Sequence, residues 1–101
     1  MDTGTLEMEF TGEVYTWRGP SPYHFIAVPE ELCVALRAVS PFASYGWGVI
    51  PVRVRIGETD FGTSLFPREG GYVVPIKDAV RHAEDLADGD NVMVELSVRG
   101  R

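Results

Sequence analysis

Cysteine and histidine are the residues of this chain best suited to metal binding, and there are few of them. Cys33, His24 and His82 lie far apart, and no CxxC, HxxxH or HExxH spacing joins them. A structural zinc site needs about four such ligands, usually in closely spaced pairs. We therefore expect no bound metal, and no motif calls for a cofactor.

Nucleophilic catalysis is also weakly supported by the sequence. Cys33 lies among apolar residues of a segment predicted to be helical, where a free cysteine usually packs as a small buried side chain. Ser44 and Ser64 are not part of a nucleophile-elbow motif. A catalytic site can be assembled from residues distant in sequence, so an enzyme stays open as an alternative to the favoured non-enzymatic role.

A second set of residues combines aromatic rings with cations and could bind a ligand. Aromatic rings stack on planar groups, and guanidinium or ammonium groups bind anions or aromatic faces. If the segments that carry these residues meet at one end of the fold, they form a candidate binding surface. The set is Trp17, Arg18, Tyr45, Trp47, Arg53 and Lys77.

Trp47 is the centre of this hypothesis, because Gly46 and Gly48 on either side leave its indole uncrowded at the mouth of a pocket. An alternative interpretation is structural. The tryptophans could fill a small core, and Arg53 with Arg55 could form the solvated face of a strand, paired with acids such as Glu95. Both interpretations remain open on the sequence alone.

The first third of the chain predicts two strands and a helix. Apolar and polar residues alternate over 6–11, which predicts a strand with one solvated face. The alternation changes over 14–17, so we expect a bulge or bend near Gly12. After a turn, residues 23–28 form a second strand. A helix then opens at Pro29 and ends at Ser40-Pro41.

The middle of the chain predicts three strands joined by short turns. Residues 50–56 alternate most clearly, and Pro51 places this strand near an edge or a bulge. Gly57-Glu58 turns it into a strand over 59–66, and the PREGG turn leads to a strand over 72–75.

The last segment predicts a helix and a closing strand. The helix covers 76–86 with Ala79, Val80, Ala83 and Leu86 facing inward, and Asp88-Gly89-Asp90 ends it. The alternating segment 92–98 is the last strand.

These elements follow the order β-β-α-β-β-β-α-β, with too few helices for a doubly wound α/β sheet. We predict an all-β fold, a small closed or partly open six-stranded barrel with two short helices, formed by a single domain over residues 1–101. A two-layer α+β sandwich is the alternative.

The composition is that of an ordinary globular domain, with 101 residues, 45% apolar and 24% charged. Since Cys33 has no partner for a disulfide, a reducing compartment is expected. The N-terminus has no signal-peptide pattern, and no apolar run approaches the ~20 residues of a membrane helix. We expect a cytoplasmic protein without membrane association.

Three segments together resemble a known family. They are MEFTGEVYTWRGPSPYHFIAVPEE, SYGWGVIPVRVRIG and TSLFPREGGYVVPIKDAVRHAEDLADGDNVMVEL. In order and spacing they are similar to the domain of unknown function 1905, from about Met8 to Val98. The resemblance implies a compact bacterial or archaeal β-barrel domain, alone or fused to other small domains, and it implies no activity. Arg68 stands where the family's FPKDGRY-like turn has a basic residue of the same charge.

A shorter resemblance covers some 25 residues, VVPIKDAVRHAEDLADGDNVMVEL. This segment is similar to half of a swapped-hairpin transcription factor of the AbrB type, which implies dimerisation and DNA binding. The same pattern also arises when a helix simply ends at Asp-Gly-Asp before a strand.

Three functional hypotheses follow. The favoured one is a non-enzymatic binding module that recognises a small molecule or a protein through the aromatic-basic residues. The alternatives are a nucleic-acid-binding or regulatory protein of the AbrB type, and an enzyme with a site built from distant residues. The sequence leaves the ligand and the oligomeric state open.

Charge gives the first testable prediction, that the protein does not bind duplex DNA at physiological salt. Each phosphate contact needs a lysine or arginine, and the chain has 9 of them against 15 acidic residues, a net charge of −6. We expect no gel shift at micromolar protein concentrations. A shift that weakens steeply with added salt would contradict this and favour the AbrB-type hypothesis.

Overall fold

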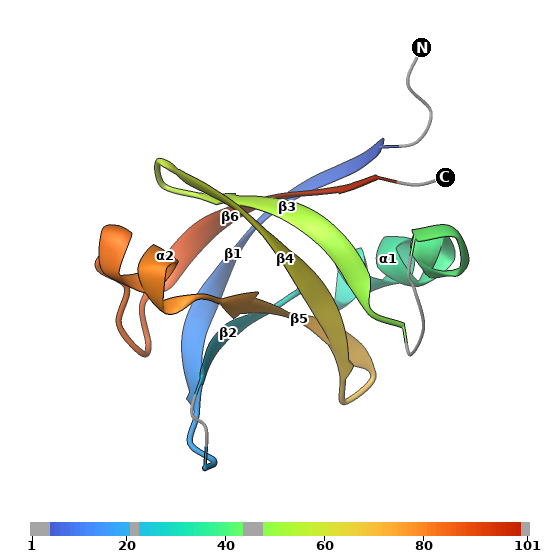
Figure 1. Cartoon of the computed structure of the whole chain (residues 1–101). Coiled ribbons are helices and arrows are strands. Elements are labelled where there is room, and N and C mark those ends of the chain that lie inside the picture. Colours follow the sequence, from blue (N-terminus) through green and yellow to red (C-terminus); the bar gives the residue numbers. More distant parts are fainter. Residues whose placement is uncertain (1–4, 21–22, 44–47, 100–101) are drawn as a thin grey trace.

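The computed structural model of this protein describes residues 5–20, 23–43 and 48–99. It contains six strands and two helices in the predicted order (Figure 1). Their bounds are β1 Thr5–Trp17, β2 Tyr23–Ala27, α1 Glu30–Ala43, β3 Ile50–Ile56, β4 Thr59–Arg68, β5 Gly71–Ile76, α2 Asp78–Ala83 and β6 Asn91–Arg99.

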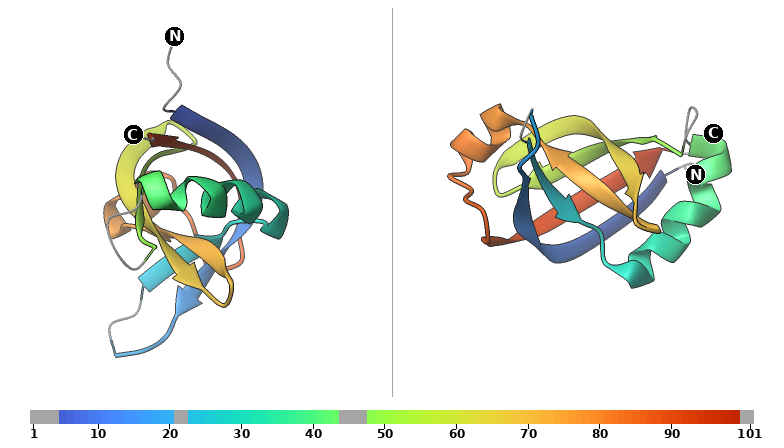
Figure 2. Two further views of the ribbon diagram at one scale, coloured as in Figure 1. Left: turned by 90° about the vertical axis from the view of Figure 1, so that its right-hand side faces the viewer. Right: turned by 90° about the horizontal axis from the view of Figure 1, so that it is seen from below.

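The strands form a closed barrel in the order β1-β2-β5-β4-β3-β6, and every neighbouring pair is antiparallel. The predicted all-β barrel is confirmed. The two helices lie on opposite sides of it, α1 near the chain termini and α2 beside the β3–β4 turn (Figures 1 and 2). Among the described residues, neither helix has the length and hydrophobicity needed to cross a bilayer.

The inward-facing side chains form one apolar core. In β3 buried and exposed residues alternate strictly, as its sequence predicts. The core extends under α1 through Leu36 and Cys33, which are 0% and 1% exposed. The prediction that Cys33 is buried is confirmed, and its thiol lies 3.6 Å from the carbonyl oxygen of Val28.

Strand β1 pairs with two different strands along its length. It pairs with β6 up to Glu13 and with β2 from Val14 onward, and its 13 residues curve around the barrel (Figure 2). The register with β6 runs without interruption, so no bulge occurs at Gly12. A Cβ atom at Gly12 would lie 2.5 Å from Cγ2 of Ile26, and this close approach requires glycine.

The inward alternation of β1 also continues past Gly12, contrary to the predicted change of pattern. Phe10 and Val14 are buried, whereas Tyr15 and Trp17 keep the outward phase and are exposed. Their size suggested that they leave the alternation. They follow it, on the outer surface.

Helix α1 extends beyond its predicted end at Ser40-Pro41, with Pro41 inside the helix. The prediction was wrong because a proline near the end of a helix removes only one backbone hydrogen bond, and its fixed φ is already close to the helical value. At the other end, the N–H groups of Leu32 and Cys33 both donate to the carbonyl oxygen of Pro29, at 3.0 and 3.2 Å.

Helix α2 is shorter than predicted. At its start, Ile76 belongs to β5 rather than to the helix. At its end, the helix stops before Asp85, whose φ of 53° is left-handed. The predicted stop at Asp88-Gly89-Asp90 therefore lies beyond the real end. Val80 and Leu86 are buried as expected.

The predicted inward orientation of Ala79 and Ala83 is wrong, because both residues are exposed. A helix of six residues has little more than one turn, so it can direct only a narrow stripe toward the core.

The strand turns follow the expected chemistry. Glu69 and Gly70 have φ values of 52° and 84°, as a tight two-residue hairpin turn between β4 and β5 requires. Pro51 pairs with Ser64 of β4 but lies outside the described β3–β6 pairs, which begin at Arg53. Pro51 therefore lies near the end of β3, where only one neighbouring strand is paired with it, a position that tolerates a proline.

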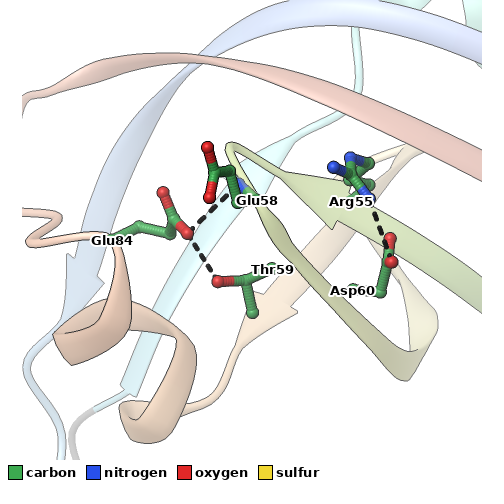
Figure 3. A network of polar contacts seen from close by, with 5 residues as sticks. All are labelled: Arg55, Glu58, Thr59, Asp60 and Glu84. Carbon is green, nitrogen blue, oxygen red and sulfur yellow. Dashed lines mark hydrogen bonds and ion pairs between the residues drawn. The ribbon is translucent and has the colours of Figure 1, made fainter.

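Glu84, just after α2, fixes the β3–β4 turn. Its carboxylate accepts hydrogen bonds from the Glu58 N–H at 3.2 Å and from the Thr59 hydroxyl at 2.5 Å (Figure 3). Gly57, with φ of 60°, lies directly against this carboxylate, where a Cβ atom would collide with it. The end of the short helix is thereby tied to the turn that lies beside it.

We predict that Gly57→Ala destabilises the fold more than Gly70→Ala. Both glycines have positive φ, so each substitution should lower the free energy of unfolding by about 1–2 kcal/mol through backbone strain. Gly70 has open space around its Cβ position, whereas alanine at Gly57 must also displace Glu84 and its hydrogen bonds, adding roughly 1–3 kcal/mol. Urea unfolding measures the difference, and equal losses would contradict the role of Glu84.

Candidate binding surface

Four aromatic side chains lie in contact on the outside of β1 and β2. Tyr15 is the register partner of Phe25, and Trp17 is the register partner of Tyr23. Ring centroids are 5.8 Å apart for Tyr15–Phe25, 5.7 Å for Phe25–Tyr23 and 5.6 Å for Tyr23–Trp17, at interplanar angles of 30° to 42°. We call this row, Tyr15, Phe25, Tyr23 and Trp17, the aromatic ladder.

Much of the ladder is accessible. Tyr15 is 45% exposed, and Trp17 and Tyr23 are each 38% exposed. Phe25 is only 8% exposed, although it does not belong to the cluster of core residues inside the barrel. Its outer neighbours, including the Tyr15 and Tyr23 rings, must therefore cover it.

The apolar layer continues across the neighbouring strands. Val73 of β5 pairs with Ala27 of β2 and with Phe66 of β4. Like Phe25, Val73 is buried without belonging to the core cluster, and Phe66 is 47% exposed. The outside of the last residues of β1, of β2 and β5 and of the end of β4 thus carries an apolar layer, on a barrel whose core is already filled from within.

Arg68 adds a cation to this face. Its guanidinium carbon lies 5.2 Å from the centre of the Phe25 ring, which is cation–π geometry. Arg68 is the last residue of β4 and leads into the β4–β5 turn, where the side chain of Arg37 in α1 donates to the Gly70 carbonyl oxygen at 2.8 Å. The turn is therefore attached to α1, which limits the positions that Arg68 can take.

A groove of about 560 Å³ lies at the Tyr15–Phe25 end of the ladder. The ladder forms one wall, the β4–β5 turn with Arg68 and Glu69 forms another, and Glu30 and Cys33 of α1 form the end. Its volume is within the range of pockets that hold small molecules or a few residues of a peptide.

At the other end of the ladder, the backbone of Gly19 packs against the Trp17 indole. A Cβ atom at Gly19 would overlap the six-membered ring. The indole is therefore held between Gly19 and Tyr23, so that little freedom is lost when a partner binds to it.

The structure brings together three of the residues in the aromatic-basic set. Trp17 is the last residue of β1 and Arg18 follows it. Lys77 directly follows Ile76, whose register partner in β2 is His24, the neighbour of Tyr23. Lys77 and Arg18 are both exposed. These three residues therefore share the Trp17–Tyr23 end of the ladder, whereas Tyr45 and Trp47 lie outside the described residues.

Arg53 lies on a different face. Its register partner in β6 is Ser97, and the register partner of Ser97 in β1 is Glu7. Glu7 lies ten residues before Trp17 along β1. Its guanidinium lies against Gly62, with Nη1 3.0 Å from the Cβ position of that glycine. The structure does not bring Arg53 to the ladder.

The face around Arg53 is a charged groove of about 650 Å³. Arg55 has Glu95 as its register partner and forms an ion pair with Asp60 at 3.0 Å (Figure 3). With both side chains about half exposed, this pair contributes little to stability. The arrangement agrees with the solvated-strand interpretation of Arg53 and Arg55.

Sequence reasoning missed Tyr15, Tyr23, Phe25 and Arg68 as members of one surface. The sequence did contain a signal for the rings, namely whether each residue takes an inward or an outward position in the alternation of its strand. Tyr15 and Trp17 share the parity of the exposed Glu7, Glu9 and Glu13, and antiparallel pairing across a short loop places Tyr23 and Phe25 opposite them. Arg68 carried no such signal, because its contact with Phe25 depends on the β2–β5–β4 order around the barrel.

The ladder presents aromatic faces, the hydroxyls of Tyr15 and Tyr23 and the indole N–H of Trp17. Among the residues that the structure describes, no three His, Cys, Asp or Glu side chains are grouped so as to hold a metal ion. The chemistry available to this surface is therefore stacking, cation–π contact and hydrogen bonding.

We predict that the ladder contributes less to stability than the core. Trp17→Ala should lower the free energy of unfolding by roughly 1–2 kcal/mol, because the indole is more than a third exposed. Leu65→Ala, at a fully buried position, should lower it by about 2–5 kcal/mol. Denaturant unfolding of both variants tests this, and an equal loss for Trp17→Ala would identify the indole as a structural element.

Comparison with known proteins identifies the family of this chain. The family described as Domain of unknown function (DUF1905) matches residues 10–96, which include all of the ladder and both helices. No curated protein matches the sequence. Since the match covers most of the 101 residues, the chain belongs to the DUF1905 family.

Proposed function

We propose that this domain is a non-enzymatic binding module and that the aromatic ladder is its binding surface. One observation carries the proposal: four aromatic rings stand side by side outside a closed barrel, and three of them are more than a third exposed. The binding partner is a protein or a small molecule.

The composition of the surface supports this role. Trp, Tyr, Phe and Arg are enriched in the centres of protein interfaces, where a few of them provide most of the binding energy. Exposed aromatic rings also carry an aggregation risk, and the core does not need them. Contact with a partner gives a physical reason for keeping them outside.

The rigidity of the surface supports binding as well. Trp17 is held by Gly19, Phe25 is held under Arg68, and the Arg68 turn is held by Arg37. Side chains fixed before binding lose less conformational entropy when a partner arrives. The single cysteine fits a reducing compartment, so we place the module in the cytoplasm of a bacterium or archaeon.

Two observations favour this proposal over its alternatives. The segment that resembles an AbrB-type hairpin pairs with β1 and β3 of its own chain. The accessible part of the ladder consists of aromatic rings, which suit the stacking and apolar contacts of a binding surface.

The test is an NMR screen of the isotope-labelled protein against a library of aromatic fragments and short peptides. We expect hits to shift the backbone amide signals of residues 14–17, 23–27 and 68–73. Tyr15→Ala should lower the affinity for these hits about tenfold or more.

Met93→Ala is the matched control, because Met93 is a large apolar residue of β6 that is 51% exposed and lies outside the ladder. It should leave binding unchanged. The proposal would be overturned if the hits shifted amide signals of β3 and β6 instead of those of the ladder. It would also be overturned if Met93→Ala lowered the affinity as much as Tyr15→Ala does.

A further inference from the structure

The two ends of the ladder differ in charge. Arg18 and Lys77 flank Trp17 and Tyr23, whereas the groove beside Tyr15 and Phe25 is bordered by the carboxylates of Glu30 and Glu69. A binding partner laid along the ladder therefore meets anionic groups at the groove and cationic groups at the far end.

Within the groove, the carboxylate of Glu30 is available to a partner. The cation of the groove, Arg68, already lies over Phe25 and is 4.0 Å from Glu69. Among the residues that the structure describes, Glu30 forms no ion pair. Glu30 and the exposed Tyr15 ring thus combine an anion with an aromatic face, the pairing that favours a guanidinium or ammonium group.

The charge of the whole protein acts in the same direction. A net charge of −6 attracts a cationic partner over a distance of about a Debye length and increases its rate of association. An acidic partner would meet repulsion from most of the surface.

The spacing of the rings suits an extended chain. Outward residues two apart on a strand are separated by roughly 7 Å, and this separates Tyr15 from Trp17. Alternate side chains of an extended peptide repeat at the same distance, so successive apolar side chains can lie on successive rings.

We propose that the occupant of this surface is an extended segment of a protein partner, with a basic side chain in the groove at Tyr15 and Glu30 and apolar side chains along the ladder toward Trp17. This inference deepens the proposed function and rests on it. It names the class of partner as a basic–apolar peptide.

The test compares two peptides by NMR titration, acetyl-Arg-Leu-Val-Leu-Tyr-amide and its counterpart with glutamate in place of arginine. We expect the arginine peptide to bind about fivefold or more tightly at low salt, with the difference shrinking as salt is added.

Glu30→Gln should weaken the arginine peptide about two- to fivefold, as expected for the loss of one exposed charge pair. Glu31→Gln is the matched control, since Glu31 is an exposed acid of the same helix turn that does not line the groove. It should bind like the unaltered protein.

Failure of this inference differs from failure of the proposed function. If both peptides bind the ladder equally, or if Glu30→Gln and Glu31→Gln behave alike, the basic side chain is ruled out while the binding surface stands. If a short oligothymidine strand shifts the ladder amides and neither peptide does, the partner is a nucleic acid and this inference is overturned. If no probe shifts the ladder amides, the proposed function fails as well.

Discussion

Closure of the barrel depends on the long strand β1, because this strand changes its partner midway. Up to Glu13 it pairs with β6, and from Val14 it pairs with β2. The change takes place where β1 passes close to Ile26, and only glycine at position 12 leaves room for that side chain. A larger residue there would force Ile26 to move at the point where β1 passes from one partner strand to the other.

The aromatic ladder is a consequence of the same strand. Since β1 keeps its alternation through the change of partner, residues 10 and 14 face the core while residues 15 and 17 face outward. The hairpin that follows places β2 opposite them, so each outward ring of β1 meets an outward ring of β2. One register therefore produces both a filled interior and a rigid aromatic exterior.

Alternation and turn chemistry made most of the fold predictable from the sequence. The strict alternation of residues 50–56 and the two-residue turn at Glu69-Gly70 each specify a local structure that the barrel retains. The helix ends were less predictable. Pro41 remains inside α1 because the loss of one hydrogen bond is small, and α2 ends early because Asp85 adopts a left-handed conformation that its sequence does not require.

The candidate surface was only partly predictable, for a physical reason. The presence of aromatic and basic residues is visible in the sequence, and Trp17, Arg18 and Lys77 do share one end of the fold. Which residues join them depends on the order of strands around the barrel. That order brings Arg68 onto Phe25, and it places Arg53 of β3 across β6 from the first half of β1, level with Ser97 and Glu7. Contacts between residues 40 or more apart in sequence follow from topology rather than from local pattern.

The structure separates the residues that stabilise the barrel from those available for binding. Inward positions such as Leu65 and Val94 are 0% exposed and carry the hydrophobic stabilisation, whereas Tyr15 and Trp17 keep much of their area in water. Substitution on the ladder can therefore alter the outer surface while leaving the core intact.

The restraints on the ladder come from groups that hold it in place: Gly19 behind the indole and Arg37, through the β4–β5 turn, behind Arg68. Because Arg37 of α1 bonds to the turn that directly follows Arg68, the shape of the groove depends on how α1 is docked against the barrel. A partner that contacts Glu30 at the start of α1 would therefore bind to the same helix that fixes the groove, and its binding should stabilise the docking of α1.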